Sequence, residues 1–463
     1  MTLNAGRRSP NGRITRRESG EPAPLSFAQE QLVLRESENP GIPPLYNECI
    51  TLRIKGSLDT AALEHSFAEI IRRHEIWRTS YDRQSGDLIQ VVHPPDSEFR
   101  LGIIDLRGIP AARQQEEAQQ VIGELVREPF DLGKGPLLRA RLIRWNDGEH
   151  QLSLAAHLSI VDGVSVYQIF PRELMALYQA YRCGRPSPLA PLSLQFGDYA
   201  AWQRKSLHEE GAAAELAYWR TQLAGEIPTL RWPPGRSRLR PTFRGKIRPF
   251  VLPSCRRDAI RALGQEEGTT QFAVLMATLA ALLHGYTRQE DIIIGTPSAA
   301  GRKQPELQGL LGHFLNPVAL RFDLSGSLTF RDLLRQTQGL ILDALSNDRM
   351  PIDLLEQELK GDPSHSGFFT VAASLQPPMP RLELDWSITS MDVDSGGAPW
   401  ELYLAFIDRT EGLMGRVQYN PDLFDDRSIA GMLENYDRLS VVVRADPEIH
   451  LSQLAAVVQK TTC

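Results

Sequence analysis

Segments with strand-like alternation are interleaved with amphipathic, helix-like segments along the whole chain, and this feature constrains the fold most. Residues 47–54 alternate as a strand does, whereas Ala62 and Phe67 lie on the apolar side of a predicted helix over 60–74. The same mixture returns in the second half of the chain. With 463 residues there is room for two or three domains. We therefore expect an α/β (or α+β) chain of two similar-sized lobes.

A connection rich in Pro, Gly and Ser begins at Cys183 with the sequence CGRPSPLAPLS, and we place the lobe boundary there. The first twenty residues are basic and polar and have no apolar core, so they do not form a secretory signal. The expected organisation is a disordered tail over residues 1–21, a first lobe over 22–183, a second lobe over 184–457 and a short tail over 458–463.

Composition excludes several functional classes. A formal charge of −6 argues against a nucleic-acid surface, and no run of about twenty apolar residues predicts a membrane span. The four cysteines form no CxxC pair and no cluster with zinc-site spacing. We expect free thiols, a cytoplasmic location, no metal, and neither nucleic acid nor membrane as a partner.

One stretch, QLSLAAHLSIVDGVSVYQIF from Gln151 to Phe170, combines a strand with polar groups at its end. The alternating strand delivers His157, and a turn closed by Asp162 and Gly163 precedes an apolar, helix-like run. Such a turn fixes polar side chains beside a cleft. A lone histidine at a strand end is more often structural, so this stretch gains weight only from the motifs around it.

Several further motifs occur in a fixed order. They are SFAQEQL (Ser26–Leu32), RHEIWRTSY (Arg73–Tyr81), FGDYAAWQR (Phe196–Arg204), LAYWRTQL (Leu216–Leu223), DIIIGTP (Asp291–Pro297), GHFLNP (Gly312–Pro317), NDRMPID (Asn347–Asp353) and VQYNPDLFDD (Val417–Asp426). With these motifs the chain resembles, from about Pro22 to Val457, the condensation domains of nonribosomal peptide synthetases, which belong to the chloramphenicol-acetyltransferase-like superfamily.

The resemblance implies two acetyltransferase-like lobes set in a V with a tunnel between them. A donor and an acceptor carrier protein, peptidyl or acyl, would each insert a phosphopantetheine arm, and an amine or hydroxyl would attack the donor thioester. The domain would hold no cofactor of its own and would act as a monomer. The product would be a peptide or peptide–polyketide.

The active-site motif of the family is HHxxxDG, and here it reads HLSIVDG. His157, Asp162 and Gly163 mark the predicted catalytic site, and Leu158 stands where the family has its second histidine, near the attacking nucleophile. Shifting His157 into that place would turn over every side chain of the strand. Loss of a general base typically removes about 10²- to 10⁴-fold in rate. Alignment of two tethered substrates can still accelerate amide formation, whereas an ester would form poorly.

The remaining site residues follow from the resemblance. We expect His157 to be mainly structural, with the alternative that it reaches the tunnel and acts as base. Asp162 is expected to pair with Arg302, and Gly163 to allow close approach of the following helix. Arg78 is predicted to be structural.

Substrate contacts and departures from the family pattern complete the prediction. Ser165 and Asn316 are taken as substrate-binding, although Asn316 could equally anchor a loop. Gln31 stands where arginine is usual, Pro317 where threonine is usual, and Asn347-Asp348-Arg349 departs from the family's preference.

Two kinds of function remain open at this point. The first is a condensation-type acyltransferase that works without the usual histidine. The alternative is a catalytically inactive relative that binds carrier proteins or recruits a tailoring enzyme. Heterocyclising and epimerising subtypes fit the motif less well. A coenzyme A-dependent enzyme would need a basic patch such as the run Arg236, Arg238, Arg240 and Arg244. The protein could be free-standing or cut from a larger synthetase.

Overall fold

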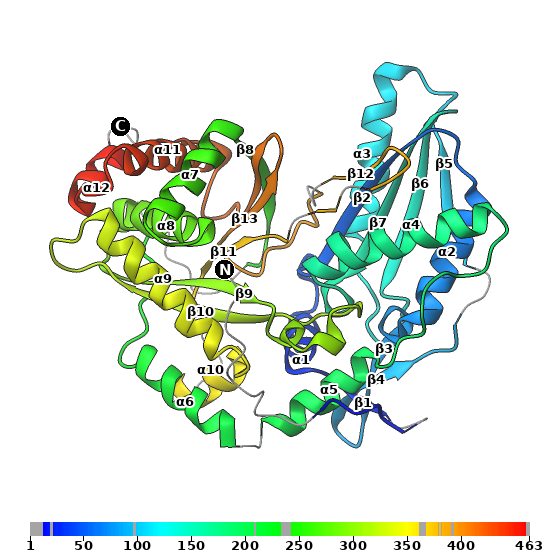
Figure 1. The fold of residues 1–463 in the computed structure, drawn as a ribbon, viewed down its shortest axis with the longest axis horizontal. Coiled ribbons are helices and arrows are strands. Elements are labelled where there is room, and N and C mark those ends of the chain that lie inside the picture. Colours follow the sequence, from blue (N-terminus) through cyan, green and yellow to red (C-terminus); the bar gives the residue numbers. More distant parts are fainter. Residues whose placement is uncertain are drawn as a thin grey trace.

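The computed structural model places two lobes side by side with a space between them, in the V that the resemblance implied (Figure 1). The described residues are 13–18, 22–95, 99–207, 210–232, 242–360, 367–377, 379–380, 382–389 and 393–459.

The first lobe is built on a five-stranded sheet with a three-stranded ribbon beneath it. The larger sheet has the order β12 (Trp386–Thr389), β2 (Asn47–Lys55), β7 (Glu149–His157), β6 (Leu138–Asn146) and β5 (Gly102–Asp105), and the ribbon has the order β1 (Ala23–Pro24), β4 (Asp87–Val92) and β3 (Thr79–Gln84). The helices of this part are α1 (Phe27–Glu38), α2 (Thr60–Arg73), α3 (Ala111–Arg127), α4 (Phe170–Arg182) and α5 (Phe196–Ser206), with the 3-10 turns η1 (Glu75–Arg78) and η2 (Leu158–Ile160).

Alternation along β7 explains how helices cover both faces of this sheet. Leu152 and Leu154 share a core with the apolar sides of α2 and α4, whereas Ala155 packs into a smaller core with α3. Successive strand side chains point to opposite faces, so one strand serves both cores. Ser26 and Asp59 are the N-caps of α1 and α2, since each side chain accepts a hydrogen bond from the first turn of its helix.

The second lobe is built on a six-stranded sheet. Its order is β10 (Asn316–Asp323), β9 (Asp291–Ser298), β11 (Val371–Leu375), β13 (Leu402–Arg409), β14 (Gly412–Tyr419) and β8 (Lys246–Pro253). Its helices are α6 (Glu210–Gln222), α7 (Ser254–Glu266), α8 (Gln271–Thr287), α9 (Phe330–Ser346), α10 (Ile352–Lys360), α11 (Asp426–Ala445) and α12 (Leu451–Gln459).

Helices cover one face of this second sheet, and the other face is turned toward the first lobe (Figure 1). Leu404 and Val417 point into the helical core with the almost entirely apolar α8, whereas Tyr403 and Arg416 point the other way, into a cavity. β8, which contains Pro249, lies at the edge of the sheet, where a residue without an N–H to donate is tolerated. Among the described helices, none is long and apolar enough by itself to cross a membrane, although α7 and α8 together, bent by 103°, pass by length and composition.

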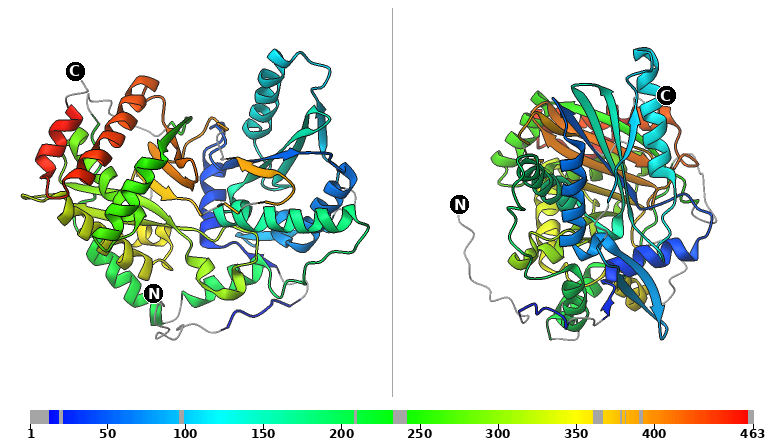
Figure 2. Two further views of the ribbon diagram at one scale, coloured as in Figure 1. Left: turned by 45° about the horizontal axis from the view of Figure 1, so that its top comes forward. Right: turned by 90° about the vertical axis from the view of Figure 1, so that its right-hand side faces the viewer.

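Three segments of the predicted second lobe pack with the first. One of them, residues 307–314, places Leu307, Leu310, Leu311 and Phe314 in the core of the first lobe. β12 pairs antiparallel with β2, Trp386 opposite Ile54, and lies against the first lobe in both Figure 1 and the left view of Figure 2. Phe196, at the start of α5, is buried in the core of the first lobe. The lobe boundary at Cys183 remains a prediction. The structure adds that these three segments, which follow Cys183 in the sequence, pack with the first lobe.

The predicted tails differ from the structure where it describes them. Ile14 is buried in the first core, and Arg17 pairs with Asp198 at 3.1 Å, so residues 13–18 lie on the body of the protein and are not a free tail. Residues 1–12, 19–21 and 460–463 are outside the described residues. Val458, assigned to the C-terminal tail, is a buried residue of α12. The burial of Ile14 and the ion pair between Arg17 and Asp198 hold residues 13–18 in place, and the burial of Val458 holds the end of α12.

The helix predicted from Val164 does not begin as a regular α-helix. Ser165–Ile169 forms a π-helical turn, and α4 follows from Phe170. Pro171 lies in the first turn of α4 and has no N–H to donate to the preceding turn, which accounts for the break in the regular ladder.

Candidate functional site

The imidazole of His157 is held on both nitrogens and is fully buried. Nδ1 accepts the backbone N–H of Ser159 at 3.3 Å, so Nε2 carries the proton and donates to the Glu36 carboxylate at 3.2 Å. Burial would raise the pKa of Glu36, but the hydrogen bonds from His157 and from the backbone of Leu45 and Tyr46 outweigh it and lower that pKa. His157 therefore ties α1 to the end of β7. The structural role is the one the geometry supports, and the alternative of a base in the tunnel is not.

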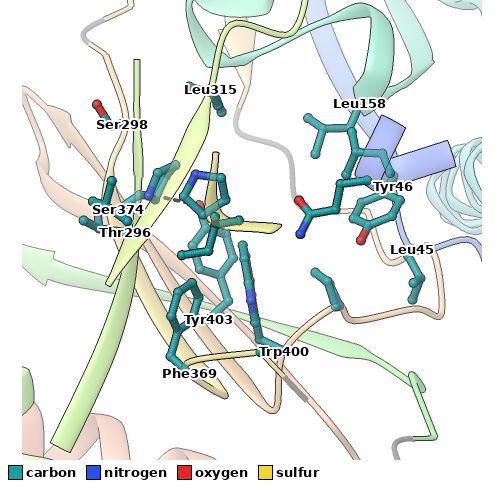
Figure 3. Close-up of a pocket in the computed structure, with 18 of the residues that line it drawn as sticks. Leu45, Tyr46, Leu158, Thr296, Ser298, Leu315, Phe369, Ser374, Trp400 and Tyr403 are labelled. Atoms are coloured by element: carbon teal, nitrogen blue, oxygen red, sulfur yellow. Dashed lines mark hydrogen bonds between the residues drawn. The ribbon is translucent and has the colours of Figure 1, made fainter. Parts of the chain in front are cut away.

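The side chain of Leu158, unlike that of His157, reaches a large cavity and is half-buried in the cavity wall (Figure 3). Its backbone N–H donates to the carbonyl of Tyr46 at 2.7 Å, which fixes the direction of the side chain. It begins the 3-10 turn η2 (Leu158–Ile160). The position that the family fills with a histidine thus presents an aliphatic side chain to the cavity.

Asp162 and Arg302 form the predicted ion pair, and both are buried. Nε and Nη2 of Arg302 each donate to one carboxylate oxygen at 2.8 Å, a bidentate arrangement. The other nitrogen, Nη1, donates to the carbonyls of Leu307 and Leu310. This pair joins the active-site turn to the segment after β9, which contains the short turns η4 (Ala300–Lys303) and η5 (Pro305–Leu307). Asp162 is a brace and is not placed to transfer a proton.

The two predicted substrate contacts are occupied by backbone groups. The hydroxyl of the fully buried Ser165 donates to the Gly312 carbonyl at 3.0 Å and also accepts from Arg302 Nη2 at 2.9 Å. The Asn316 amide donates to the carbonyls of Asp348 and Met350, both at 2.8 Å. Neither belongs to the cavity wall formed by the described residues, so the loop-anchoring alternative for Asn316 is the one observed.

Arg78 and Gly163 also act on the architecture. Arg78 Nη1 donates to the carbonyl of His93 just beyond β4, which agrees with its predicted structural role. Gly163 lies in the cavity wall, and a Cβ there would come within 2.7 Å of Oε1 of Gln376 in the second lobe. The close approach is therefore between the two lobes, and not from the following helix as the sequence suggested.

The cavity between the lobes has a volume of about 1870 Å³ and takes its walls from both. Leu45, Tyr46 and Leu158 lie on the first-lobe side in Figure 3, facing Thr296, Ser298, Ser374 and Tyr403 on the second-lobe side. Phe369, Trp400 and Tyr403 form an aromatic cluster, with ring centroids 6.1 and 5.2 Å apart for successive pairs.

An ion pair inside the cavity joins the two lobes. Arg416 of β14 is buried and lies 3.3 Å from the carboxylate of Glu48 on β2. Sequence reasoning missed both residues, because they are separated by 368 positions and neither belongs to a recognisable pattern.

A half-buried carboxyl in the cavity wall was also missed. Asp353 of α10 accepts a hydrogen bond from Gln31 of α1. Burial, and next the charge of Glu356, raise the pKa of Asp353 to about 7, although Arg35 opposes them. A neutral glutamine at the position where the family has arginine leaves this carboxylate with less compensating charge.

Asp353 should make folding stability fall as the pH rises. The folded protein retains the proton up to about pH 7, whereas the unfolded chain loses it near the ordinary value of 3.8, so the folded state binds more protons in that window. Asp353→Asn keeps an acceptor for Gln31 and removes the titration. We expect the variant to exceed the native protein in unfolding free energy by on the order of 2 kcal/mol at pH 8, and by little at pH 4.5. Urea denaturation at both pH values measures this, and parallel pH curves would contradict it.

The described residues offer no clustered metal ligands, and their cysteines are unpaired. No group of three or more His, Cys, Asp or Glu side chains among them is arranged to hold a metal ion. Cys49, Cys183 and Cys255 are free thiols. Of the basic run considered for a nucleotide, only Arg244 lies within the described residues, where it pairs with Asp422 at 2.8 Å.

Comparison with known proteins now defines the class. The family model of the condensation domain matches residues 20–462, and the chain belongs to this family. It is 37% identical over 431 residues to one of the linear gramicidin synthase proteins of Brevibacillus parabrevis, covering 92% of this chain and 6% of that protein. It is 33% identical over 456 residues to phosphinothricin tripeptide synthetase PhsC of Streptomyces viridochromogenes, covering 96% of this chain and 41% of that protein. The chain thus spans a minor part of these relatives.

Solved structures give the same fold. The X-domain from teicoplanin biosynthesis superposes with a TM-score of 0.81 at 25% identity, covering 95% of this chain and 99% of that one. The first condensation domain of the calcium-dependent antibiotic synthetase superposes with a TM-score of 0.82 at 21% identity, covering 94% and 99%. The predicted fold, two chloramphenicol-acetyltransferase-like lobes, is confirmed.

Proposed function

We propose that this protein transfers an acyl group from a carrier-protein thioester to an amine held by a second carrier protein, within the cavity between the lobes. The observation that carries the proposal is the cavity itself, about 1870 Å³ in volume, lined by both lobes and bordered by the braced turn that contains Leu158. One of the relatives is named as a tripeptide synthetase, which supports the same reaction class.

The chemistry is proposed to depend on alignment more than on proton abstraction. Leu158 offers no group that can accept a proton, and both nitrogens of His157 are engaged elsewhere. Holding the two reactants in line can replace a large part of the lost catalysis, since effective molarities of about 10⁵ M and above are reached in well-oriented systems. An amine is nucleophilic when neutral, whereas a hydroxyl requires deprotonation. Amide formation is therefore the proposed reaction.

The partners follow from this reaction. Donor and acceptor carrier proteins, peptidyl or acyl, would supply the substrates on their phosphopantetheine arms, and the domain would need no resident cofactor. We propose a monomer that works in the cytoplasm. The donor and acceptor would be drawn from the substrates of a peptide or peptide–polyketide assembly line.

A second candidate function is recruitment without catalysis, and Leu158 is the observation that favours it. One similar structure, 26% identical with a TM-score of 0.80, is a complex of the teicoplanin X-domain with OxyB. A condensation-like domain with an aliphatic side chain at the base position could serve as such a docking platform.

Intact-protein mass spectrometry of donor and acceptor carrier proteins distinguishes the two. The proposal predicts that the acyl mass moves from donor to acceptor in the presence of the protein, faster than in its absence. If carriers bind, yet neither the native protein nor Leu158→His moves the acyl group, acyl transfer is excluded and recruitment is left.

A further inference from the structure

A second imidazole borders the cavity, on the segment between η5 and β10. His313 belongs to the GHFLNP motif, and its side chain is 5% exposed and forms part of the cavity wall. The sequence alone predicts no role for His313, because this histidine is the only one in its motif and lies far along the chain from the HLSIVDG turn.

The tautomer of His313 follows from its one hydrogen bond. Nδ1 lies 3.1 Å from the carbonyl oxygen of Val161, and a carbonyl can only accept, so Nδ1 carries the proton and Nε2 carries the lone pair. Among the described residues, none forms a hydrogen bond with Nε2. Nε2 is nevertheless not an enclosed atom without a partner, so it is accessible. The lone pair is therefore open to the cavity.

This arrangement differs from that of the neighbouring buried histidines. His157 uses Nδ1 for Ser159 and Nε2 for Glu36. His74 uses Nδ1 for the Leu311 N–H and Nε2 for Glu173. A purely structural imidazole in this region has both nitrogens engaged, and His313 does not.

The anchor of His313 is the turn that begins at Leu158. The N–H of Val161 donates to the Leu158 carbonyl at 3.3 Å, and the carbonyl of Val161 receives His313 Nδ1. The ring is thus fixed to the turn whose first side chain occupies the usual place of the base. Burial lowers the pKa of His313 to about 4, so the ring is neutral at physiological pH and the lone pair of Nε2 is free to accept a hydrogen bond.

We propose that His313 Nε2 accepts a hydrogen bond from the attacking amine and takes up its proton, replacing the group lost at Leu158. The inference rests on the proposed function and names a catalytic residue for it. The amine nitrogen attacks the thioester carbonyl, the C–N bond forms and the C–S bond breaks. One proton passes from nitrogen to Nε2 and then to the departing thiolate of the donor arm. An amide and a free thiol result, and no other reactant is needed.

The test compares two substitutions at one position. His313→Asn keeps a donor near the place of Nδ1, and with it the bond to Val161, but removes the Nε2 lone pair. His313→Ala removes both. We expect His313→Asn to lower single-turnover acyl transfer by about 10²-fold, at the low end of the range for a general base, with carrier-protein affinity and melting temperature unchanged. His313→Ala should lose at least as much.

A double-mutant comparison separates catalysis from structure. In Leu158→His, the new imidazole can also accept the proton. Adding His313→Asn to this variant should therefore lower the single-turnover rate of acyl transfer much less than it does in the native protein. Equal losses in both backgrounds, or native transfer rates in His313→Asn, would overturn the role of His313 alone. If the native protein transfers nothing while its carriers bind, the proposed function fails, and His313 falls with it.

Discussion

Leu158→His raises the rate of acyl transfer by about 10²-fold, the low end of what a positioned general base contributes. The backbone N–H of residue 158 is fixed by the Tyr46 carbonyl at 2.7 Å, so the new imidazole should leave the turn in the same direction as the leucine. The cavity of about 1870 Å³ offers room for it. Because Leu158 is half-buried, little folding stability should be lost.

Two matched variants at the same position make this result specific. Leu158→Phe changes size without adding a base and should not accelerate transfer. Leu158→Trp projects a larger ring into the cavity and should slow transfer without loss of carrier binding. Single-turnover rates measured by intact-protein mass spectrometry provide the comparison. A native rate that Leu158→His leaves unchanged would show that a base at position 158 adds nothing to this protein.

Arg302→Ala lowers the free energy of unfolding by about 3–5 kcal/mol, the range for a buried ion pair that loses one partner. The substitution leaves the buried carboxylate of Asp162 without its bidentate partner, and the carbonyls of Leu307 and Leu310 each lose the hydrogen bond from the Arg302 guanidinium. Urea denaturation measures the loss. The pair Arg220–Glu358, with both side chains more than half exposed, is the matched control. Arg220→Ala should change the free energy by less than about 1 kcal/mol.

The double variant Asp162→Asn with Arg302→Ala keeps this prediction testable if Arg302→Ala folds poorly. Because it removes the buried charge together with its partner, it should be more stable than Arg302→Ala alone. A loss below about 1 kcal/mol in Arg302→Ala would show that water reaches the carboxylate and that the pair is not a brace.

The sequence was sufficient for those features that depend on local pattern or on a family motif. Helix and strand periods located most elements, because amphipathic spacing and N-cap chemistry are encoded within a few residues. The HLSIVDG string located Leu158 at the cavity and predicted Asp162 with Arg302. The elements that were not predicted include β1, β3, β5, β12, α10 and α12. β5 and β12 have four residues each, too few for a period to stand out.

The rest of the site depends on contacts between distant parts of the chain. Glu48 with Arg416 and Gln31 with Asp353 are joined only by folding, with 368 and 322 positions between them. Ser165 and Asn316 looked available for substrate because a sequence does not show which backbone groups require their side chains. The free lone pair on Nε2 of His313 can be inferred only once the structure shows that Nδ1 donates to the carbonyl of Val161.

The most direct test of the account compares an amine acceptor with a hydroxyl acceptor of the same shape, each loaded on the acceptor carrier protein. The account holds that alignment in the cavity supports the native protein without the histidine at position 158. It predicts amide formation on the order of 10²-fold or more above the rate without protein. Ester formation should be far slower than amide formation, because the weakly basic Nε2 of His313 does not deprotonate a hydroxyl. Ester formed as readily as amide, or no amide at all, would contradict it.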